Sequence, residues 1–224
     1  MAEAIISTAK ANQRVGRTAS KEVRRRQLIE ATIESIAQRG ISGTTMNTVT
    51  SLAGLSLGIV NFHFNNKQTL FEETLRYLAE EHRDQWQKGV RDAALTPEAR
   101  LLAMVDAEFH PNICSRKKLT VWFAFYGEAA YRASYRRIMT EMDSDRWRNS
   151  RALCQQIVDG GDYADADADD IANTLEGLYD GFCLNILIYP GEFTREDAKR
   201  RVGDYLATTF PQNFTRPAPP ACKG

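Results

Sequence analysis

Residues 44–67 read TTMNTVTSLAGLSLGIVNFHFNNK, a pattern of two short helices joined by a tight turn. Thr44 or Thr45 can cap the first helix, because a hydroxyl oxygen there accepts a hydrogen bond from an unpaired N–H of the first turn. Gly54 permits the turn, and Ser56 can cap the second helix. A short capped helix after a glycine turn is typical of a helix-turn-helix, whose second helix enters the major groove of DNA. An ordinary helical hairpin is the alternative interpretation.

Outside this stretch nearly every periodic segment has helical spacing and strand signals are scarce, so the chain is predicted to be all-α. It contains no long apolar run and its first residues lack the apolar core of a signal peptide, so neither a membrane span nor secretion is expected. The cysteines lie far apart without paired spacing, which predicts reduced thiols in a cytoplasmic protein and no metal site. They are Cys114, Cys154, Cys183 and Cys222.

The pattern of helices and breaks divides the chain into four predicted segments. A flexible arm at 1–18 precedes a three-helix domain at 19–66, whose first helix runs from about Ser20 to Arg39 and stops at Gly40. A larger helical domain follows at 67–210, and a flexible tail at 211–224. The larger domain is predicted to begin with a helix at about 67–89 and to hold about five more, at about 97–109, 119–131, 134–159, 168–189 and 195–210.

The charge is divided unevenly along the chain. Residues 1–67 carry nine Lys or Arg against four Asp or Glu, whereas the remainder carries 20 against 25. A basic module on an acidic body suits a protein that meets phosphate at one end, although chance segregation of surface charge would look the same. Arg24 and Arg25 lie in the first turns of a helix, where cations oppose the helix dipole. This locally unfavourable choice indicates phosphate contact, with a solvated face as the alternative.

The second short helix offers side chains that suit base and phosphate contact. Asn61 can bond to adenine N6 and N7, and Gly58 lets the backbone approach the duplex closely. His63 can donate to a phosphate oxygen, and Lys67 begins the next helix, where free N–H groups favour an anion. The predicted DNA-binding residues are Arg24, Arg25, Thr44, Thr45, Ser56, Leu57, Gly58, Asn61, His63 and Lys67.

An aromatic segment in the larger domain is the candidate ligand site. Trp122, Phe125 and Tyr126 have the spacing of one helix face. Trp147 is expected nearby, and the carboxylates of Asp106, Glu108 and Glu128 within reach. Aromatic faces with carboxylates form cages for quaternary ammonium ions, worth roughly 0.5–2 kcal/mol per contact. The predicted ligand-binding residues are Trp122, Phe125, Tyr126, Trp147 and Asp106, and plain core packing is the alternative.

Two further helices are candidates for a homodimer interface. They lie at about 143–158 and 171–188, and the second is apolar around more of its circumference than one buried face needs. A central core helix is the alternative. No histidine pair with metal-ligand spacing, nucleophile elbow or phosphate loop is present, so an enzyme and a resident cofactor are not expected. A helical interaction module without DNA would not explain the basic first third together with the capped short helix.

The pattern T-T-M-x-x-V-x-x-x-A-G-L-S-x-G-I-V-x-F-H-F-x-N-K-x-x-L-F over residues 44–71 resembles the DNA-binding domain of the TetR family of bacterial repressors. The resemblance implies an all-α homodimer that binds double-stranded operator DNA. It also implies that the domain at 67–210 binds a ligand and dimerises, with its first helix as the lever between ligand and DNA. The family commonly carries tyrosine where this chain has Asn61 and His63, which makes the contact of His63 less certain and suggests a different operator preference.

A finer resemblance extends over most of the chain. The segments GIVNFHFNNKQTLFEETLRYL, LTVWFAFYGEAAY, EGLYDGFCLNILI and DAKRRVGDYL are similar to the BetI branch of the TetR family. That branch represses the genes that convert choline to the osmoprotectant glycine betaine, and choline releases it from DNA. The resemblance implies a choline pocket without identifying its lining. A TetR-type repressor that responds to a different small hydrophobic or cationic ligand is the alternative.

Overall fold

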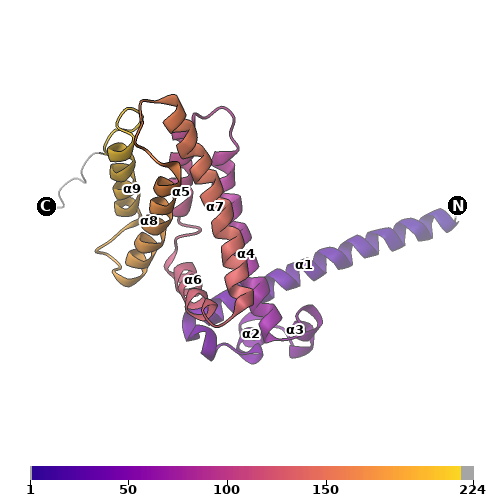
Figure 1. Ribbon diagram of the computed structural model, residues 1–224. Coiled ribbons are helices and arrows are strands. Elements are labelled where there is room, and N and C mark those ends of the chain that lie inside the picture. Colours follow the sequence, from indigo (N-terminus) through magenta and orange to yellow (C-terminus); the bar gives the residue numbers. More distant parts are fainter. Residues whose placement is uncertain (1, 218–224) are drawn as a thin grey trace. The chain divides into compact units, whose positions relative to one another are not determined.

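The computed structural model describes residues 2–217, with side chains from Lys21 onward. These residues contain nine α-helices and no strand, which confirms the predicted all-α fold (Figure 1). Two compact units divide the chain, Met1–Tyr77 and Leu78–Gly224. The division falls within α4, Lys67–Val90, so that the second unit begins eleven residues after the start of the larger domain predicted from the sequence. The first turns of α4 belong to the first unit because Glu73 pairs with Arg25 and Tyr77 lies under Arg26.

The first unit opens with α1, Ala2–Gly43. Its regular course ends at Gly40, whose φ of 70° is left-handed and favours glycine, so the predicted stop is confirmed. Its start at Ala2 lies well before the predicted Ser20. The flexible arm predicted for residues 1–18 falls where the structure describes no side chains, and its flexibility stays a prediction.

Two short helices complete the helix-turn-helix, α2 at Met46–Ala53 and α3 at Leu57–His63. Thr45 caps α2, because its hydroxyl accepts from the Thr48 N–H and the Thr48 hydroxyl accepts from the Thr45 N–H. Gly54 ends α2 with φ 62° and makes the turn. Ser56 occupies the N-cap position of α3, but its side chain makes no capping hydrogen bond, so that predicted role is wrong.

Apolar side chains from each of these helices form the core of the first unit. One apolar face of α1 is buried, and Gln27 Nε2 donates to the Ala53 carbonyl at 2.7 Å, which ties α1 to the end of α2. The seven-residue α3 is too short to be stable alone, so this packing is what holds it. The core residues of the first unit include Leu28, Ile29, Ile33, Ile36, Val49, Ala53, Val60, Phe64 and Leu70.

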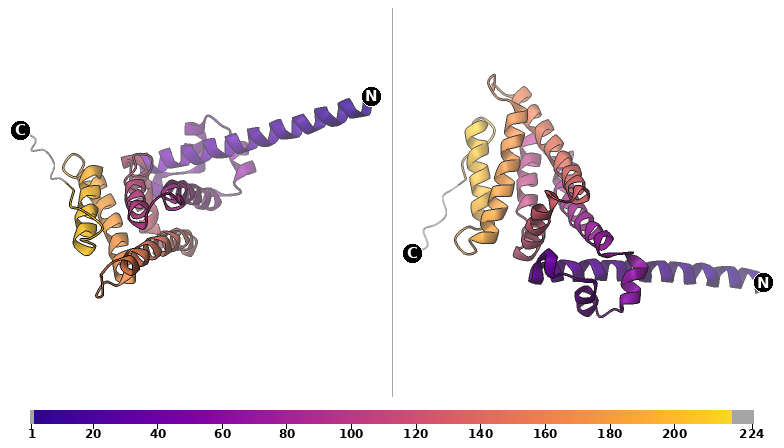
Figure 2. Two further views of the ribbon diagram at one scale, coloured as in Figure 1. Left: turned by 90° about the horizontal axis from the view of Figure 1, so that it is seen from above. Right: turned by 60° about the horizontal axis from the view of Figure 1, so that its bottom comes forward.

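The second unit contains the rest of α4 and the five further helices that the sequence predicted. They are α5 (Pro97–Glu108), α6 (Arg116–Ala129), α7 (Ala133–Gly160), α8 (Ala168–Ile188) and α9 (Arg195–Thr209). Helix α8 packs between α7 and α9, as both views in Figure 2 show. Side chains that cap four of these helices are Thr96, Ser115, Asp167 and Thr194.

The core of the second unit is built around large aromatic side chains. Trp86, Phe109, Tyr179 and Phe210 are all nearly or fully buried. Phe214 packs against the same cluster, so ordered packing continues past the predicted domain end at 210. Part of the predicted flexible tail, 218–224, lies outside the described residues. Within the described part of the chain, no helix is both long and apolar enough to span a bilayer.

Candidate functional site

The outer face of α3 carries the residues predicted to read DNA. Leu57, Gly58 and Asn61 are exposed, as is Ser56 just before them. Among the described residues, neither Ser56 nor Asn61 has a side-chain hydrogen bond. A Cβ added at Gly58 would meet only Ser56 Oγ, at 3.9 Å, so packing does not require glycine there. This face therefore presents free polar groups and an unobstructed backbone.

Basic side chains surround α3 within the first unit. Arg24 is exposed and, in the described part of the chain, has no ion pair, whereas Arg25 pairs with Glu73 and stacks on Phe64. Lys21, which the sequence did not single out, lies 5.5 Å from the centre of the Phe62 ring on α3. Of the two predicted arginines, Arg24 therefore has an unpaired, exposed guanidinium within the described residues, whereas the guanidinium of Arg25 is fixed by Glu73 and Phe64.

The pKa of His63 reports the basic environment of α3. It is lowered by burial first and then by the charge of Lys21, with smaller contributions from Arg25 and Arg24. An imidazole with a lowered pKa is neutral at pH 7 and keeps one N–H donor. The part of the lowering that comes from Lys21, Arg25 and Arg24, which Glu22 opposes, reflects a positive field of the kind that attracts phosphate.

Three of the predicted DNA contacts have structural roles in the first unit. Thr44 is fully buried and its hydroxyl donates to the Gly40 carbonyl at 2.9 Å, so the structure does not bring it to the surface. Thr45 is exposed and caps α2. The Lys67 ammonium is 3.4 Å from the Ile41 carbonyl, so the side chain folds over its own unit.

A small cavity in the second unit, with a volume of about 40 Å³, is the candidate ligand site. Trp122, Phe123 and Tyr126 of α6 form its aromatic wall, and the ring centres of Trp122 and Tyr126 are 6.4 Å apart. Its polar side comes from α4, α5, α7 and α8. Those residues are His82, Glu108, Arg146, Asp180 and Cys183.

Arg146 organises the buried charges around this cavity. Its guanidinium is 3.2 Å from Glu108 and 2.5 Å from Glu176, and it lies over the ring of Tyr179. His82 Nε2 is 2.7 Å from the same Glu108 oxygen. A buried carboxylate is tolerated only when it is paired in this way.

Four carboxylates share this one arginine and the imidazole of His82, and their pKa values reflect the competition. Burial opposes ionisation of Glu108, but His82 and Arg146 outweigh it and lower the pKa of Glu108 to about 2. Burial raises the pKa of Asp143 to about 6 despite Arg146, with the charges of Asp180 and Glu176 adding to the rise.

The pKa values of Glu176 and Asp180 are also raised, by burial in the first place. Neighbouring carboxylate charges add to these rises, and that part of the shift is one that a further positive charge nearby would relieve. Aromatic rings beside excess carboxylate are the chemistry that binds a small organic cation.

The structure brings together only part of the predicted ligand set. Trp122 and Tyr126 line the cavity, but Phe125 is fully buried against Tyr135, with ring centres 5.1 Å apart. Trp147 donates from Nε1 to Asn173 at 2.8 Å and does not line the cavity. Asp106 is exposed and pairs with Lys199 at 2.8 Å, on the opposite side of α5 from the cavity.

Several residues that line the cavity escaped the sequence analysis. His82, Arg146 and Asp180 come from three different helices, with no local motif that joins them. Glu108 was named as one of three acids within reach, and its place two residues from Asp106 gave no way to choose between them. Glu128, the third acid, instead pairs with Arg132 at 2.8 Å.

Comparisons with known proteins match both the first and the second part of the chain. Residues 28–74 match the model of bacterial regulatory proteins of the tetR family, and residues 97–211 match the C-terminal domain of BetI-type transcriptional repressors. The HTH-type transcriptional regulator BetI of Burkholderia thailandensis is 33% identical over 189 residues, which cover 83% of this chain and 93% of that protein. The BetI of Paraburkholderia phymatum is 33% identical over 196 residues, 86% and 96% of the two chains.

Solved structures share the fold. A transcriptional regulator from Pseudomonas aeruginosa PAO1 aligns with a TM-score of 0.76 and 24% identity, over 85% of this chain and 92% of that one. A transcriptional regulator from Saccharomonospora viridis, solved in complex with choline, aligns with a TM-score of 0.73 and 20% identity, over 81% and 94%. At these identities the likeness extends to the fold alone.

Proposed function

This chain belongs to the TetR family of bacterial regulators and carries the C-terminal domain of BetI-type repressors, and from that premise we propose that choline is its effector. The regulated genes are those that convert choline to glycine betaine, and choline releases the repressor from their operator. The observation that carries the proposal is the cavity that combines Trp122, Phe123 and Tyr126 with the carboxylates of Glu108 and Asp180. The choline bound to the Saccharomonospora viridis regulator supports the same effector class.

Choline is a permanent cation with a methylated ammonium head, and each part has a complement here. The aromatic wall offers cation–π contact to the methyl groups. Glu108, Asp143, Glu176 and Asp180 outnumber the positive charges available to them, so the cation relieves their mutual repulsion. An anionic or neutral ligand would gain neither contribution.

Binding is proposed to change the conformation because the cavity is small. A space of about 40 Å³ has room for roughly one to three water molecules. Choline enters only when Trp122 and Tyr126 move apart, and α4 contributes His82 to the wall that must adjust. A modest coupling of about 1–3 kcal/mol between effector and operator binding changes affinity by roughly 5- to 150-fold.

The DNA contacts are proposed to come from two copies of the first unit in a homodimer. The recognition helices α3 enter successive major grooves roughly 34–36 Å apart. Asn61 and Leu57 read base edges, while Ser56, Thr45 and Arg24 contact the backbone. Lys21 adds a further phosphate contact. A protein that binds operator DNA in a bacterium acts in the cytoplasm, which is the location predicted from the sequence.

The decisive experiment is a calorimetric titration of choline into the parent protein, Trp122→Ala and Trp147→Ala. Loss of the cage wall in Trp122→Ala is expected to weaken binding by roughly 2- to 30-fold, the range given by one cation–π contact. Trp147→Ala is expected to bind like the parent because Trp147 lies on another surface. Equal losses of affinity in both variants would show that choline does not bind in this cavity. The absence of binding by the parent at millimolar choline would show that choline is not the effector.

A second titration addresses the direction of the response. The parent is mixed with operator DNA from upstream of its own gene, and choline is then added. Release of the DNA at the choline concentration that saturates the calorimetric signal is the expected result. Tighter DNA binding in the presence of choline would make the protein a choline-dependent binder and contradict the proposed release.

A further inference from the structure

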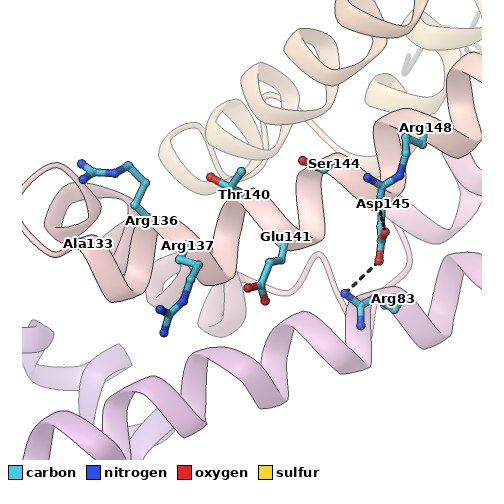
Figure 3. A pocket seen from close by; sticks show the side chains of 9 residues that line it. All are labelled: Arg83, Ala133, Arg136, Arg137, Thr140, Glu141, Ser144, Asp145 and Arg148. Carbon is cyan, nitrogen blue, oxygen red and sulfur yellow. Dashed lines mark hydrogen bonds and ion pairs between the residues drawn. The ribbon is translucent and has the colours of Figure 1, made fainter.

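Three successive residues of α4 join this helix to three other helices of the second unit. The middle one, His82, bonds to Glu108 of α5 and lines the candidate ligand cavity of about 40 Å³, here called the effector cavity. Arg83 joins α4 to Asp145 of α7 at 3.1 Å, and Figure 3 shows the two side chains meeting between the helices. The position of α4 therefore depends on side-chain contacts made at one level of the helix.

The third link runs from Glu81 of α4 to Lys118 of α6. The Lys118 ammonium lies 2.5 Å from the Glu81 carboxylate and 2.5 Å from the carbonyl oxygen of Asn112, in the loop before α6. The side chains of Lys118 and Glu81 are only 20% and 33% exposed. A pair that is partly shielded from water is worth more than a fully exposed one. One side chain thus joins α4, the loop and α6.

Lys118 and its two partners each stand directly before a residue that lines the effector cavity. Those lining residues are His82 of α4, Ile113 of the loop and Leu119 of α6. Trp122, in the aromatic wall, lies one helical turn after Lys118 on the same side of α6. The link therefore holds together three of the segments that enclose the cavity.

The charge of Lys118 is locally unfavourable where it stands. Lys118 lies in the first turn of α6, and its backbone N–H donates to Ser115 Oγ, which caps the helix. A cation near a helix N-terminus opposes the helix dipole. A local choice of this kind indicates a role outside the helix itself, and the contacts with Glu81 and Asn112 supply one.

The joint between α4 and α6 is the one that these contacts secure. The backbones of α4 and α6 make little direct contact, whereas α6 packs closely on α7 and α8. Side chains are therefore what holds α4 against α6, and separation of these two helices disrupts the least packing. The effector cavity is too small for choline, so binding requires its walls to separate.

We propose that the Lys118–Glu81 pair is a latch that holds the start of α6 against α4 and keeps the effector cavity closed. Choline binding must break this pair, so the latch lowers the affinity for choline and sets the concentration at which the regulator responds. The proposal rests on the proposed function for the identity of the effector, but the opening itself can be measured without choline.

The first test measures the opening by thiol labelling. Methyl methanethiosulfonate is a small neutral reagent, and the labelled cysteines are identified by peptide mass. Cys183 lines the effector cavity and is 7% exposed, so its labelling rate reports the opening of the cavity. Cys154 is fully buried in the core and does not line the cavity, so its labelling rate reports unfolding.

Two variants break the latch from either side, Lys118→Met and Glu81→Gln. Each is expected to raise the labelling rate of Cys183 by roughly two- to ten-fold, the range for loss of one partly shielded charged contact, and to leave Cys154 at the parent's rate. Lys199→Met is the control, because it breaks a comparable ion pair that joins α9 to α5. It is expected to label like the parent.

Calorimetry with choline gives the second readout on the same proteins. An apparent Kd falls as the binding-competent fraction rises, so both latch variants are expected to bind choline more tightly, by the same factor as the labelling rate. Lys118→Met removes a positive charge and Glu81→Gln a negative one. A purely electrostatic effect on a cation would therefore change the two affinities in opposite directions.

Three results would overturn the latch. They are labelling of Cys183 at the parent's rate in both variants, a rise that Cys154 shares, and choline affinities that change in opposite directions. Faster labelling of Cys183 alone, in a protein that does not bind choline, would support the latch and overturn only the choice of effector.

Discussion

At the scale of single residues, Asp106 and Glu108 show how two similar carboxylates two positions apart take different roles. Successive residues of an α-helix are separated by about 100°, so these two point to nearly opposite sides of α5. Glu108 faces the cavity, buried with His82 and Arg146, whereas Asp106 is exposed and pairs with Lys199. The acid that lines the cavity is the buried one, paired with both His82 and Arg146.

The pKa of Asp143 makes choline binding dependent on pH. This pKa is raised to about 6, so the carboxyl loses its charge as the pH falls through 6. A cation is held better by the ionised group, and choline affinity is therefore expected to be up to about ten-fold weaker at pH 5.0 than at pH 7.5. The raised pKa values of Glu176 and Asp180 act in the same direction. Calorimetry at the two pH values measures the ratio.

Two variants separate Asp143 from acids elsewhere. Asp143→Asn is expected to flatten the pH dependence and to weaken binding at pH 7.5. Asp106→Asn is expected to keep the parent's pH dependence because its carboxyl is exposed and pairs with Lys199, whereas that of Asp143 lies beside Arg146. The same affinity at both pH values in the parent would show that these carboxylates do not contribute to the site.

At the scale of elements, the rotation of α6 decides which aromatic residues line the cavity. If Trp122 is taken as zero, Tyr126 lies about 40° and Phe123 about 100° to one side, while Phe125 lies about 60° to the other. The cavity is on the side of Phe123, so Phe125 turns toward Tyr135 at the start of α7. Spacing alone identifies residues that share a face, but not which half of that face meets a neighbouring helix.

Helix α3 carries a glycine that its packing does not explain. Gly58→Ala is expected to stabilise the fold by about 0.5–1 kcal/mol, because alanine has the higher helix propensity and its Cβ meets only Ser56 Oγ. The same change is expected to weaken operator binding, because the added methyl group keeps the backbone from the duplex. Thermal unfolding and DNA titration on one sample test both parts.

Gly54→Ala is the matched comparison in the turn before α3. Its φ of 62° is strained for alanine, so this variant is expected to lose about 1–2 kcal/mol of stability. If Gly58→Ala also destabilised the protein, Gly58 would serve the fold. If the variant kept full affinity for DNA, the close contact of Gly58 with the duplex would be excluded.

At the scale of the whole molecule, helix α8 both fills the core of the second unit and leaves apolar side chains uncovered. Leu175, Tyr179 and Cys183 are buried, whereas Leu184 and Ile188 remain 39% and 53% exposed. The helix predicted at 143–158 is the second half of α7, and many of its apolar residues are used in the core. Of the two predicted interface helices, α8 therefore keeps more surface for a second copy.

The double variant Leu184→Asp with Ile188→Asp is expected to be monomeric at concentrations where the parent is a dimer. Charges at these positions would have to be buried without partners in an interface through α8. Operator affinity is expected to fall at least ten-fold, because a monomer loses the linkage between two half-sites. Sedimentation equilibrium and DNA titration measure the two effects.

Leu102→Asp on α5 provides the control, since Leu102 is 42% exposed but lies on a helix not predicted to dimerise. It is expected to remain a dimer. A double variant that still sediments as a dimer would exclude Leu184 and Ile188 of α8 from the interface. Retained choline binding would show that the second unit is intact.

The sequence by itself determined what depends on neighbours along the chain. A threonine cap at the start of α2, the turn at Gly54, the stop at Gly40 and the helical periods depend on residues within about one helical turn of one another. The structure then chose Thr45 over Thr44 as the cap. These features were enough for the all-α fold, the helix-turn-helix and its exposed face at Leu57, Gly58 and Asn61.

Only the tertiary structure decided which distant side chains meet. His82, Glu108, Arg146 and Asp180 come from four helices, and their contacts depend on the rotation and crossing of those helices. Burial and these contacts together then shift the carboxyl pKa values, since the buried Arg146 pairs with both Glu108 and Glu176. The same rotation removed Phe125, Trp147 and Asp106 from the predicted cage. Local spacing along the chain does not determine how helices pack against one another, so the lining of the cavity could not be predicted from sequence alone.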